Sequence, residues 1–434
     1  MARFLDLDGA PHVDTATFCC DVGQRISAKR GVPTDIVPPM RWICAPCALV
    51  LGCGFSAPRG GAPDPDASSD SSTGMDAAID GTPVDGPPVK GPRVRRIDIT
   101  DAQVTGGPHT DFPLLVSLTE SWLRGTASGG DVASASGFDI GFFADAAGTM
   151  RLAHELELYR GETGALVAWV KVPALSPTTE LFLRYGDPAI AASQEDAAAV
   201  WSNDFAAVWH LQGLGDSTAN ANAGTDGGSM GAGGQIADGR AFDGMNDLVA
   251  LGSAASIDDV FTGGGTAEAW VRAAGWGEGS RGRILEKGDT ATGETSGWYV
   301  SVDNANVSAS ILFGHVSTTG SRLGAWNTPA SSMALNAWTH VAVVYDQGST
   351  ANDPSIYING AAVALSETSS PGGSMASDGA GVARLGNRGA GDRTFNGRID
   401  EMRLSRTARS AEWIATSFRD QADPGAFYTV GPEL

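Results

Sequence analysis

Short β-rich runs follow one another along most of this chain, and their spacing limits the fold more than any other feature. Between residues 93 and 187 they read RVRRIDIT, DFPLLVSLT, FDIGFFA, LAHELELYR, ALVAWVKVP and ELFLRYG. Glycine, proline and serine separate them at intervals of roughly ten residues, which is typical of an antiparallel sandwich. A chain with 58 glycines, 22 prolines and only 18% charged residues also suits strands and turns better than long surface helices.

A second series of strands is predicted over residues 205–434, after a bridging segment at 188–204. It includes AAVWHL, TAEAWVRA, AWTHVAVVYD, PSIYINGAAV and GRIDEMRLS. Asn359 and Gly360 predict a type I′ hairpin turn, because both central residues of that turn need a positive φ. One helix is predicted at SAEWIATSFRDQ, with Ser410 as its N-cap. The fold class is therefore all-β: two consecutive antiparallel β-sandwich domains, 93–187 and 205–434, with one short C-terminal helix.

The segment MRWICAPCALVLGC, residues 40–53, is the most apolar stretch of the chain. Its single arginine, apolar run and final Gly52 fit an export signal. The ending VLGC resembles the lipobox of bacterial lipoproteins, in which a lipid is attached to the cysteine. That resemblance implies a lipoprotein signal peptide at residues 40–52 and lipidation of Cys53. A redox or metal-binding pair at Cys44 and Cys47, or an incidental apolar segment, stays open as an alternative, although a redox pair needs a βαβ pattern beside it.

Residues 57–92 lack any hydrophobic period and hold almost nothing that could be buried. Residues 1–39 are interpreted as a mis-called start or as disordered, and residues 53–92 as a disordered tether. All five cysteines lie in the first 53 residues, so the β domains must be stable without disulfides. The lipoprotein resemblance implies an exported protein at the outer membrane or cell surface of a Gram-negative bacterium. It would contact the membrane only through its lipid, since no apolar run reaches about 18 residues.

The second strand series resembles laminin-G-like, concanavalin-A-like jelly rolls of bacterial surface proteins. The resemblance rests on VWHL, FDGMNDLVAL, TAEAWVRA, NAWTHVAVVYD, IYINGAAV and FNGRIDEMRLS in that order. It implies a two-sheet sandwich that often recognises ligands at its loops or on a concave face. Residues 93–187, with TDFPLLVSLT, FDIGFF, HELELY, AWVKVP and LFLRYG, are similar to an uncharacterised bacterial β domain that commonly precedes such a jelly roll. That similarity implies no known activity.

The sequence gives little support for a catalytic function. The five histidines after residue 93 have no paired spacing, and the formal GxSxG match at 227–231 lies in a loop. A glycosidase needs two carboxylates flanking a cleft, and the Glu-x-Asp-x-x-Glu string of the related laminarinase-like enzymes is absent. Glu155 and Glu157 alternate with leucines, which predicts the wet face of a half-buried strand. Asp400 and Glu401 are adjacent and are expected on opposite faces. We therefore predict no catalytic residue.

Aspartates and one asparagine are candidate metal ligands. Asp400 shares its strand parity with Met402 and Leu404, and a carboxylate on a core-facing row must be neutralised or hydrogen-bonded. In laminin-G-like and related lectin folds, such aspartates can bind a structural calcium ion. Calcium prefers hard oxygen ligands, so the candidate ligands are Asp216, Asp243, Asn246, Asp247 and Asp400. The alternative, in which Asp400 bonds backbone amides or an arginine without metal, stays open.

Tryptophans supply the candidate ligand contacts. Trp209, Trp270 and Trp338 sit inside strand motifs and are expected in the core. Trp276 and Trp326 are predicted to lie in Gly-rich loops, where an exposed indole face could stack on a sugar ring; packing within the loop is the alternative.

The function that combines these observations is an exported, lipid-anchored, non-catalytic recognition protein that binds carbohydrate or extracellular matrix. It is expected to be a monomer. The net charge of −21 argues against nucleic acid as a partner. The alternatives are a structural or protein-binding envelope component and a polysaccharide hydrolase.

Overall fold

The computed structural model describes residues 91–288, 296–304, 309–316 and 323–434. Within these ranges the chain is almost entirely β, and every named strand pair is antiparallel. The expectations for residues 1–90, including the signal peptide and Cys53, lie outside the described residues. None of the described helices is long and apolar enough to cross a membrane.

The first sandwich is formed by one sheet of three strands and one of five. The smaller sheet has the order β2 (His109–Thr119), β6 (Ala165–Leu175) and β5 (His154–Arg160). The larger has the order β24 (Tyr428–Glu433), β1 (Arg93–Ile99), β7 (Glu180–Tyr185), β3 (Gly141–Phe143) and β4 (Arg151–Leu152). Apolar side chains such as Leu114, Phe142 and Leu183 fill the space between them.

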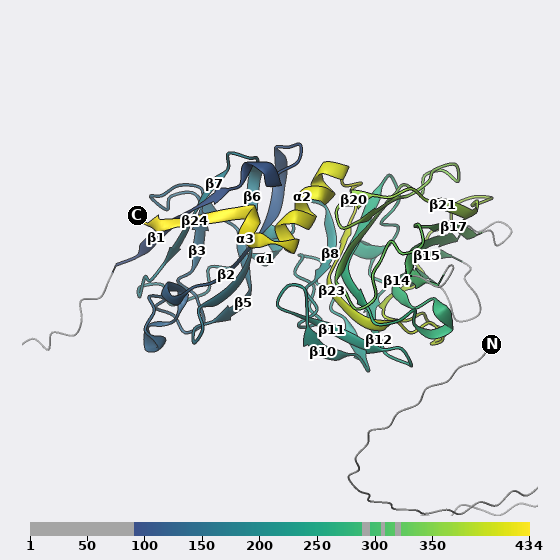
Figure 1. Cartoon of the computed structure of the whole chain (residues 1–434), viewed down its shortest axis with the longest axis horizontal. Helices are drawn as coiled ribbons and strands as arrows, with labels where there is room; N and C mark the ends of the chain where they lie inside the picture. The colour runs from purple at the N-terminus through teal and green to yellow at the C-terminus, as the bar shows by residue number, and fades with distance from the viewer. Residues whose placement is uncertain (1–90, 289–295, 305–308, 317–322) are drawn as a thin grey trace, which may run out of the picture. The chain divides into compact units, whose positions relative to one another are not determined.

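The last strand of the chain completes this first sandwich. β24 pairs with β1, placing Ile97 opposite Val430 and Ile99 opposite Tyr428 (Figure 1). The predicted domain 205–434 therefore differs from the structure at its C-terminal end. Without β24 the strand β1 would present an open edge, and a pairing between opposite ends of the chain leaves no local mark in the sequence.

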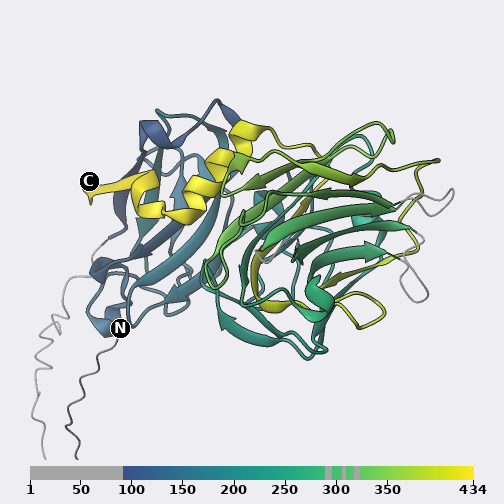
Figure 2. The same ribbon diagram turned by 45° about the vertical axis from the view of Figure 1, so that its right-hand side comes forward.

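The second sandwich consists of two eight-stranded sheets, whose long strands run side by side in Figure 2. The first sheet has the order β10 (Met230–Gly233), β11 (Asp238–Asp243), β23 (Asn396–Ser405), β13 (Gly265–Ala273), β18 (Thr339–Tyr345), β19 (Ser355–Ile358) and β20 (Ala361–Ala362), with β8 (Phe205–Trp209) paired to β23. The second has the order β21 (Ser366–Ser369), β17 (Leu323–Asn327), β16 (Ser310–Val316), β15 (Gly297–Asp303), β14 (Arg283–Gly288), β22 (Val382–Leu385), β12 (Leu248–Gly252) and β9 (Thr225–Gly227).

Two local predictions are confirmed. Asn359 and Gly360 join β19 to β20 with φ values of 50° and 75°, as a type I′ turn requires. The predicted helix is α2 (Ala411–Ala422), and the Ser410 side chain accepts a hydrogen bond from the backbone N–H of Trp413. The other α-helices of the described part are the four-residue α1 (Ala197–Val200), inside the predicted bridging segment, and α3 (Pro424–Phe427).

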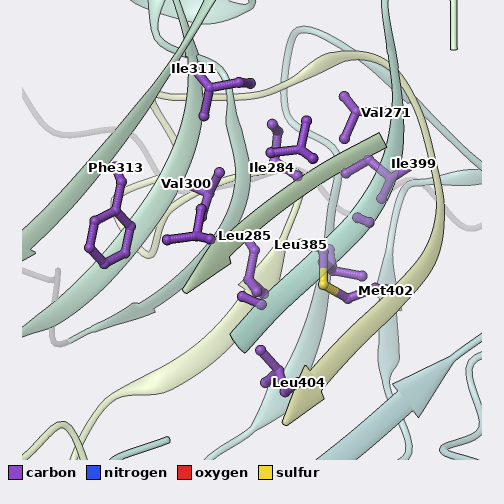
Figure 3. Close-up of a cluster of buried hydrophobic side chains, with 14 of the residues drawn as sticks. Val271, Ile284, Leu285, Val300, Ile311, Phe313, Leu385, Ile399, Met402 and Leu404 are labelled. Carbon is purple, nitrogen blue, oxygen red and sulfur yellow. The ribbon is translucent and has the colours of Figure 1, made fainter. Parts of the chain in front are cut away.

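A bulge at Glu401 changes which side chains of β23 face the core. Asp400 pairs with Trp270 and Arg403 with Glu268, so β23 holds one more residue than β13 across this stretch, and Glu401 has a φ of 51°. Met402 thus points into the same apolar cluster as Ile399, as Figure 3 shows. The predicted shared parity of Asp400 with Met402 and Leu404 is therefore wrong.

Candidate functional site

Three carboxylates, one imidazole and one guanidinium meet where β5 of the first sandwich faces β8 and β23 of the second. We call this group the charge cluster; its members are Glu155, Glu157, His210, Glu401 and Arg403. The Nδ1 atom of His210 lies 2.7 Å from Oε1 of Glu401 and 3.6 Å from Oε2 of Glu157. Its Nε2 atom lies 3.2 Å from Oε2 of Glu155. Both ring nitrogens therefore face carboxylates.

The glutamates of β5 point toward the second sandwich. A register shift between Leu156 and Leu158 places an extra residue in β5, at Glu157. The side chain of Glu157 is 0% exposed and that of Glu155 only 14%. The prediction of a wet acidic face is wrong, because segments that are distant in the sequence cover this face of β5. Trp201 is one of them and donates its indole N–H to Glu155 at 2.7 Å.

Aromatic rings enclose the cationic members of the cluster. Arg403 bonds Oε2 of Glu401 at 2.6 Å, and its guanidinium lies 4.3 Å from the ring centroid of Trp169 and 4.8 Å from that of Trp201. The imidazole of His210 stacks on Trp169 at 5.9 Å with an interplanar angle of 17°. Because the surrounding aromatic rings limit the access of water, each charge–charge and cation–π contact is stronger than it would be on the surface.

The protonation behaviour follows from burial and from the neighbouring charges. Burial opposes ionisation of Glu155, yet the hydrogen bond and charge of His210 hold its pKa below the ordinary value. Burial also opposes ionisation of Glu401, but the charges and hydrogen bonds of His210 and Arg403 outweigh it and lower the pKa of Glu401. Burial and the charge of Glu401 raise the pKa of Glu157 well above its ordinary value. Burial works against the imidazolium of His210, but Glu401 and Glu157 outweigh it and raise the pKa.

An open cleft of about 720 Å³ lies over the solvent side of the cluster. Glu155 and His210 form part of its wall, together with α1 and the segment that follows β8. Ser217 donates its hydroxyl to Oε1 of Glu155 at 2.6 Å, and the exposed Gln212 donates to the carbonyl of Glu157 at 2.5 Å. The residues that line the cleft are Glu155, Ala197, Ala198, His210, Leu211, Gln212, Gly213, Gly215, Asp216 and Ser217. The volume is in the usual range for a small-molecule site.

The predicted calcium ligands are engaged in local hydrogen bonds. Asp216 accepts backbone N–H bonds from Val208, Thr218 and Asn222, which fixes the segment after β8. Asp400 accepts from the backbone N–H groups of Gln235, Ile236 and Glu401, and burial together with the Glu401 charge raises its pKa well above the ordinary value. Asp400 thus makes the contacts of the metal-free alternative.

The other candidate ligands lie at the end of β11 and in the turn that joins it to β12. Asp243 and Asn246 are exposed, and Asp247 is buried and accepts the backbone N–H of Asp243 at 2.8 Å. Among described His, Cys, Asp and Glu side chains, only Glu157, His210 and Glu401 form a group of three with ligand atoms within 4.8 Å of one another. The predicted calcium set forms no such group.

The structure differs from the prediction in which tryptophans are buried and which lie in loops. Trp326 lies in β17, is 1% exposed and stacks on Phe313, so the expectation that it offers a free face to a sugar is wrong. Its ring packs in the apolar core of the second sandwich, and its indole N–H donates to Oδ1 of Asp353 at 2.9 Å. Trp276 does lie in a loop; it is half-buried against the core. Trp209 and Trp270 are core residues as predicted, and Trp338 is partly buried.

Residues 242–415 match a family model described as the concanavalin A-like lectin/glucanases superfamily. A search of curated proteins found no significant match. Among solved structures, domain 4 of AbnA, a GH43 extracellular arabinanase from Geobacillus stearothermophilus solved with arabinotriose, is 18% identical with a TM-score of 0.36, covering 50% of this chain and 98% of that chain.

Two toxin domains are also similar, and this chain spans about half the length of each. The binding domain of Paraclostridial Mosquitocidal Protein 1 is 15% identical with a TM-score of 0.37, over 50% of this chain and 52% of that chain. The ligand-binding domain of botulinum neurotoxin serotype D, solved with N-acetylneuraminic acid, is 12% identical with a TM-score of 0.37, over 52% and 53%. The family match and the jelly-roll sheets agree that the C-terminal region of this chain contains a concanavalin A-like domain.

Proposed function

We propose that this protein recognises a neutral glycan in the cleft over Glu155 and His210. The observation that carries the proposal is the fixed set of polar groups in the wall of a cleft of about 720 Å³. Sites for small ligands combine a concave surface with a few precisely oriented polar groups. The family match to a superfamily of lectins and glucanases at residues 242–415 supports the same class of ligand.

Hydrogen bonds inside the protein orient these groups before any ligand arrives. Glu155 is held by Trp201, Ser217 and His210 at 2.7, 2.6 and 3.2 Å. A carboxylate oriented in this way accepts hydrogen bonds from sugar hydroxyls at little further cost in side-chain entropy. The ionised Glu155 and the nearby Asp216 disfavour sulfated, phosphorylated or sialylated sugars, since like charges repel.

The proposed recognition is non-catalytic. A glycosidase needs two carboxyl groups on either side of the sugar, with room for a water molecule or a covalent intermediate. Glu157 and Glu401 have fully buried side chains, so in this arrangement they do not reach a sugar in the cleft. Asp216 also lines the cleft, and both its oxygens accept hydrogen bonds from the segment that it orders, Oδ1 from Thr218 and Oδ2 from Asn222.

We further propose that the protein is exported, monomeric and attached to a bacterial membrane through lipidated Cys53. The apolar segment at residues 40–52 and the position of all cysteines before residue 54 support this proposal. Mass spectrometry of the membrane fraction tests it. The expected peptide begins at Cys53 and carries acyl chains, whereas an unmodified Cys53 joined to residues 1–39 would contradict both anchoring and export.

A glycan array followed by calorimetry tests the ligand class. We expect neutral oligosaccharides to bind and Glu155→Gln to weaken binding at least tenfold, since the substitution replaces an oriented acceptor with an amide. Glu162→Gln, on an exposed turn after β5, is the matched control and should bind as the wild type does.

Each other outcome points to a different function. Loss of binding in Trp276→Ala but not in Glu155→Gln would move the site to the Trp276 loop. A blank array combined with a specific co-purifying envelope protein would favour a structural or protein-binding component. Release of reducing ends from a polysaccharide would overturn the non-catalytic proposal.

A further inference from the structure

We propose that Glu157, His210 and Glu401 bind a divalent transition-metal ion of the Zn²⁺ class. The site is assigned from the charge cluster alone and does not depend on glycan recognition. The ion would bind Nδ1 of His210 and one carboxylate oxygen each from Glu157 and Glu401. The three residues come from β5, from the position directly after β8, and from β23, so the ion would join both sandwiches.

The spacing of the ligand atoms fits such an ion. Ligands at about 2.1 Å from a metal lie about 3.0 Å apart in octahedral and about 3.4 Å apart in tetrahedral geometry. Nδ1 of His210 is 2.7 Å from Oε1 of Glu401 and 3.6 Å from Oε2 of Glu157. The two separations that include His210 are close to the required values, and all three ligand atoms lie within 4.8 Å of one another. Binding of one ion would therefore draw the two carboxylates toward the imidazole and toward each other.

An unpartnered carboxylate oxygen points to a missing ligand. Oε2 of Glu157 accepts the indole N–H of Trp169 at 2.9 Å, but its buried Oε1 has no hydrogen-bond partner. A buried polar atom without a partner costs free energy, and such atoms in native proteins call for an explanation. A cation removes the deficit if it binds Oε1 of Glu157, because Oε2 already accepts from Trp169.

The remaining atoms of the ligands are already held as they are in metal sites. Metal-ligating histidines usually donate their second ring N–H to a carboxylate, which fixes the ring. Here Nε2 of His210 faces Oε2 of Glu155 at 3.2 Å. Arg403 likewise holds Oε2 of Glu401 at 2.6 Å. Both ligands are therefore oriented by residues that would not touch the ion.

Charge and chemistry favour a divalent ion that accepts nitrogen. Three carboxylates of the cluster face one permanently charged guanidinium, that of Arg403, so the buried anionic excess needs protons or a cation. Calcium and magnesium prefer all-oxygen sites, whereas imidazole with carboxylates suits zinc and its first-row neighbours. The cleft beside His210 gives the ion a route from solvent.

Equilibrium dialysis of the full chain against ZnCl₂ tests the site. The five cysteines, all at or before residue 53, are first alkylated so that thiolates cannot bind the metal. We expect about one Zn²⁺ per chain and a higher melting temperature with zinc than with EDTA. Glu157→Gln and His210→Gln should each weaken binding at least tenfold. His340→Gln, which removes another buried histidine beside a buried glutamate, should leave it unchanged.

Two results would overturn the proposal. One is the absence of stoichiometric Zn²⁺ binding by the folded wild type; the other is unchanged affinity in folded Glu157→Gln and His210→Gln. If these variants do not fold, X-ray absorption of the zinc-loaded wild type decides. One imidazole nitrogen and oxygen ligands support the site, whereas several imidazoles or only oxygens contradict it.

Discussion

Replacing Arg403 with methionine should destabilise the protein by about 3 kcal/mol, the lower end of the cost of breaking a buried ion pair. Arg403 and Glu401 have side chains that are 1% and 0% exposed and lie 2.6 Å apart. Methionine keeps most of the side-chain volume but leaves Glu401 without its guanidinium. His210 remains beside Glu401 at 2.7 Å, which is why we take the lower end. The lost cation–π contacts with the two tryptophans add to the cost.

A double-mutant cycle separates the ion pair from the packing. Glu401→Gln alone should also be strongly destabilising, because it leaves Arg403 buried beside a neutral amide. The double variant should lose less than the sum of the two single losses, by about 2 kcal/mol, since neither charge is then left unmatched. Arg96→Met is the surface control: its ion pair with Asp98 is well exposed and should be worth less than about 1 kcal/mol.

Urea unfolding at pH 7, in EDTA so that no metal contributes, measures each free energy. Two results would refute the reasoning. In the first, Arg403→Met is no more destabilising than Arg96→Met. In the second, the single losses are additive in the double variant. Either one would mean that water reaches the Arg403–Glu401 pair in solution and screens it.

Four further substitutions test stability. Asp216→Ala should lower the free energy of unfolding by about 2–4 kcal/mol because several N–H donors lose their acceptor. Asp400→Ala should lower the melting temperature by the same amount in calcium as in EDTA. Melting curves would contradict the metal-free contacts if calcium raised the wild-type melting temperature and either variant abolished that rise. Burial lowers the pKa of His315, which is 0% exposed and whose Nε2 lies 3.1 Å from Oε1 of Gln347, from the ordinary 6.5. The folded protein therefore resists charging this ring, so stability should be intact above pH 6.5 and fall below it, by at most about 1.4 kcal/mol per pH unit for one proton. His315→Gln should flatten that slope in pH-dependent unfolding, and an unchanged slope would assign it to other groups. Trp326→Ala should cost about 3–5 kcal/mol by leaving a core cavity, whereas a near-neutral effect in urea unfolding would show that this ring is not packed as described.

Local chemistry made parts of the fold predictable. The spacing of β-rich runs predicted antiparallel sandwiches because turn residues and strand periodicity act over a few neighbouring residues. The Ser410 cap and the Asn359–Gly360 turn were predictable for the same reason, and both occur in the structure. The pairing of β24 with β1 was not predictable, since it joins the two ends of the described chain.

The charge cluster escaped prediction for physical reasons. A β-bulge adds one residue and reverses the alternation of side chains beyond it. The bulge at Glu401 moves Asp400 off the face that it was predicted to share with Met402 and Leu404. Glu155 and Glu157 do face the same way, but that face is covered by the second sandwich and not by water. The other missing information is long-range: His210 meets Glu155 and Glu401 across 55 and 191 residues. A single histidine in AAVWHL gives no sign of either partner.

The position of the cluster also bears on how the two sandwiches pair. Apolar contacts between sheets tolerate small shifts, because one aliphatic side chain can replace another against the same surface. Buried charges do not, since each must meet its own partner or remain desolvated without compensation. A shift of β5 by one residue would turn Glu155 and Glu157 away from His210 and leave Arg403 as a buried cation with fewer anions. The charge cluster therefore penalises other registers of β5 against β8 and β23, and the wall of the cleft depends on that one register.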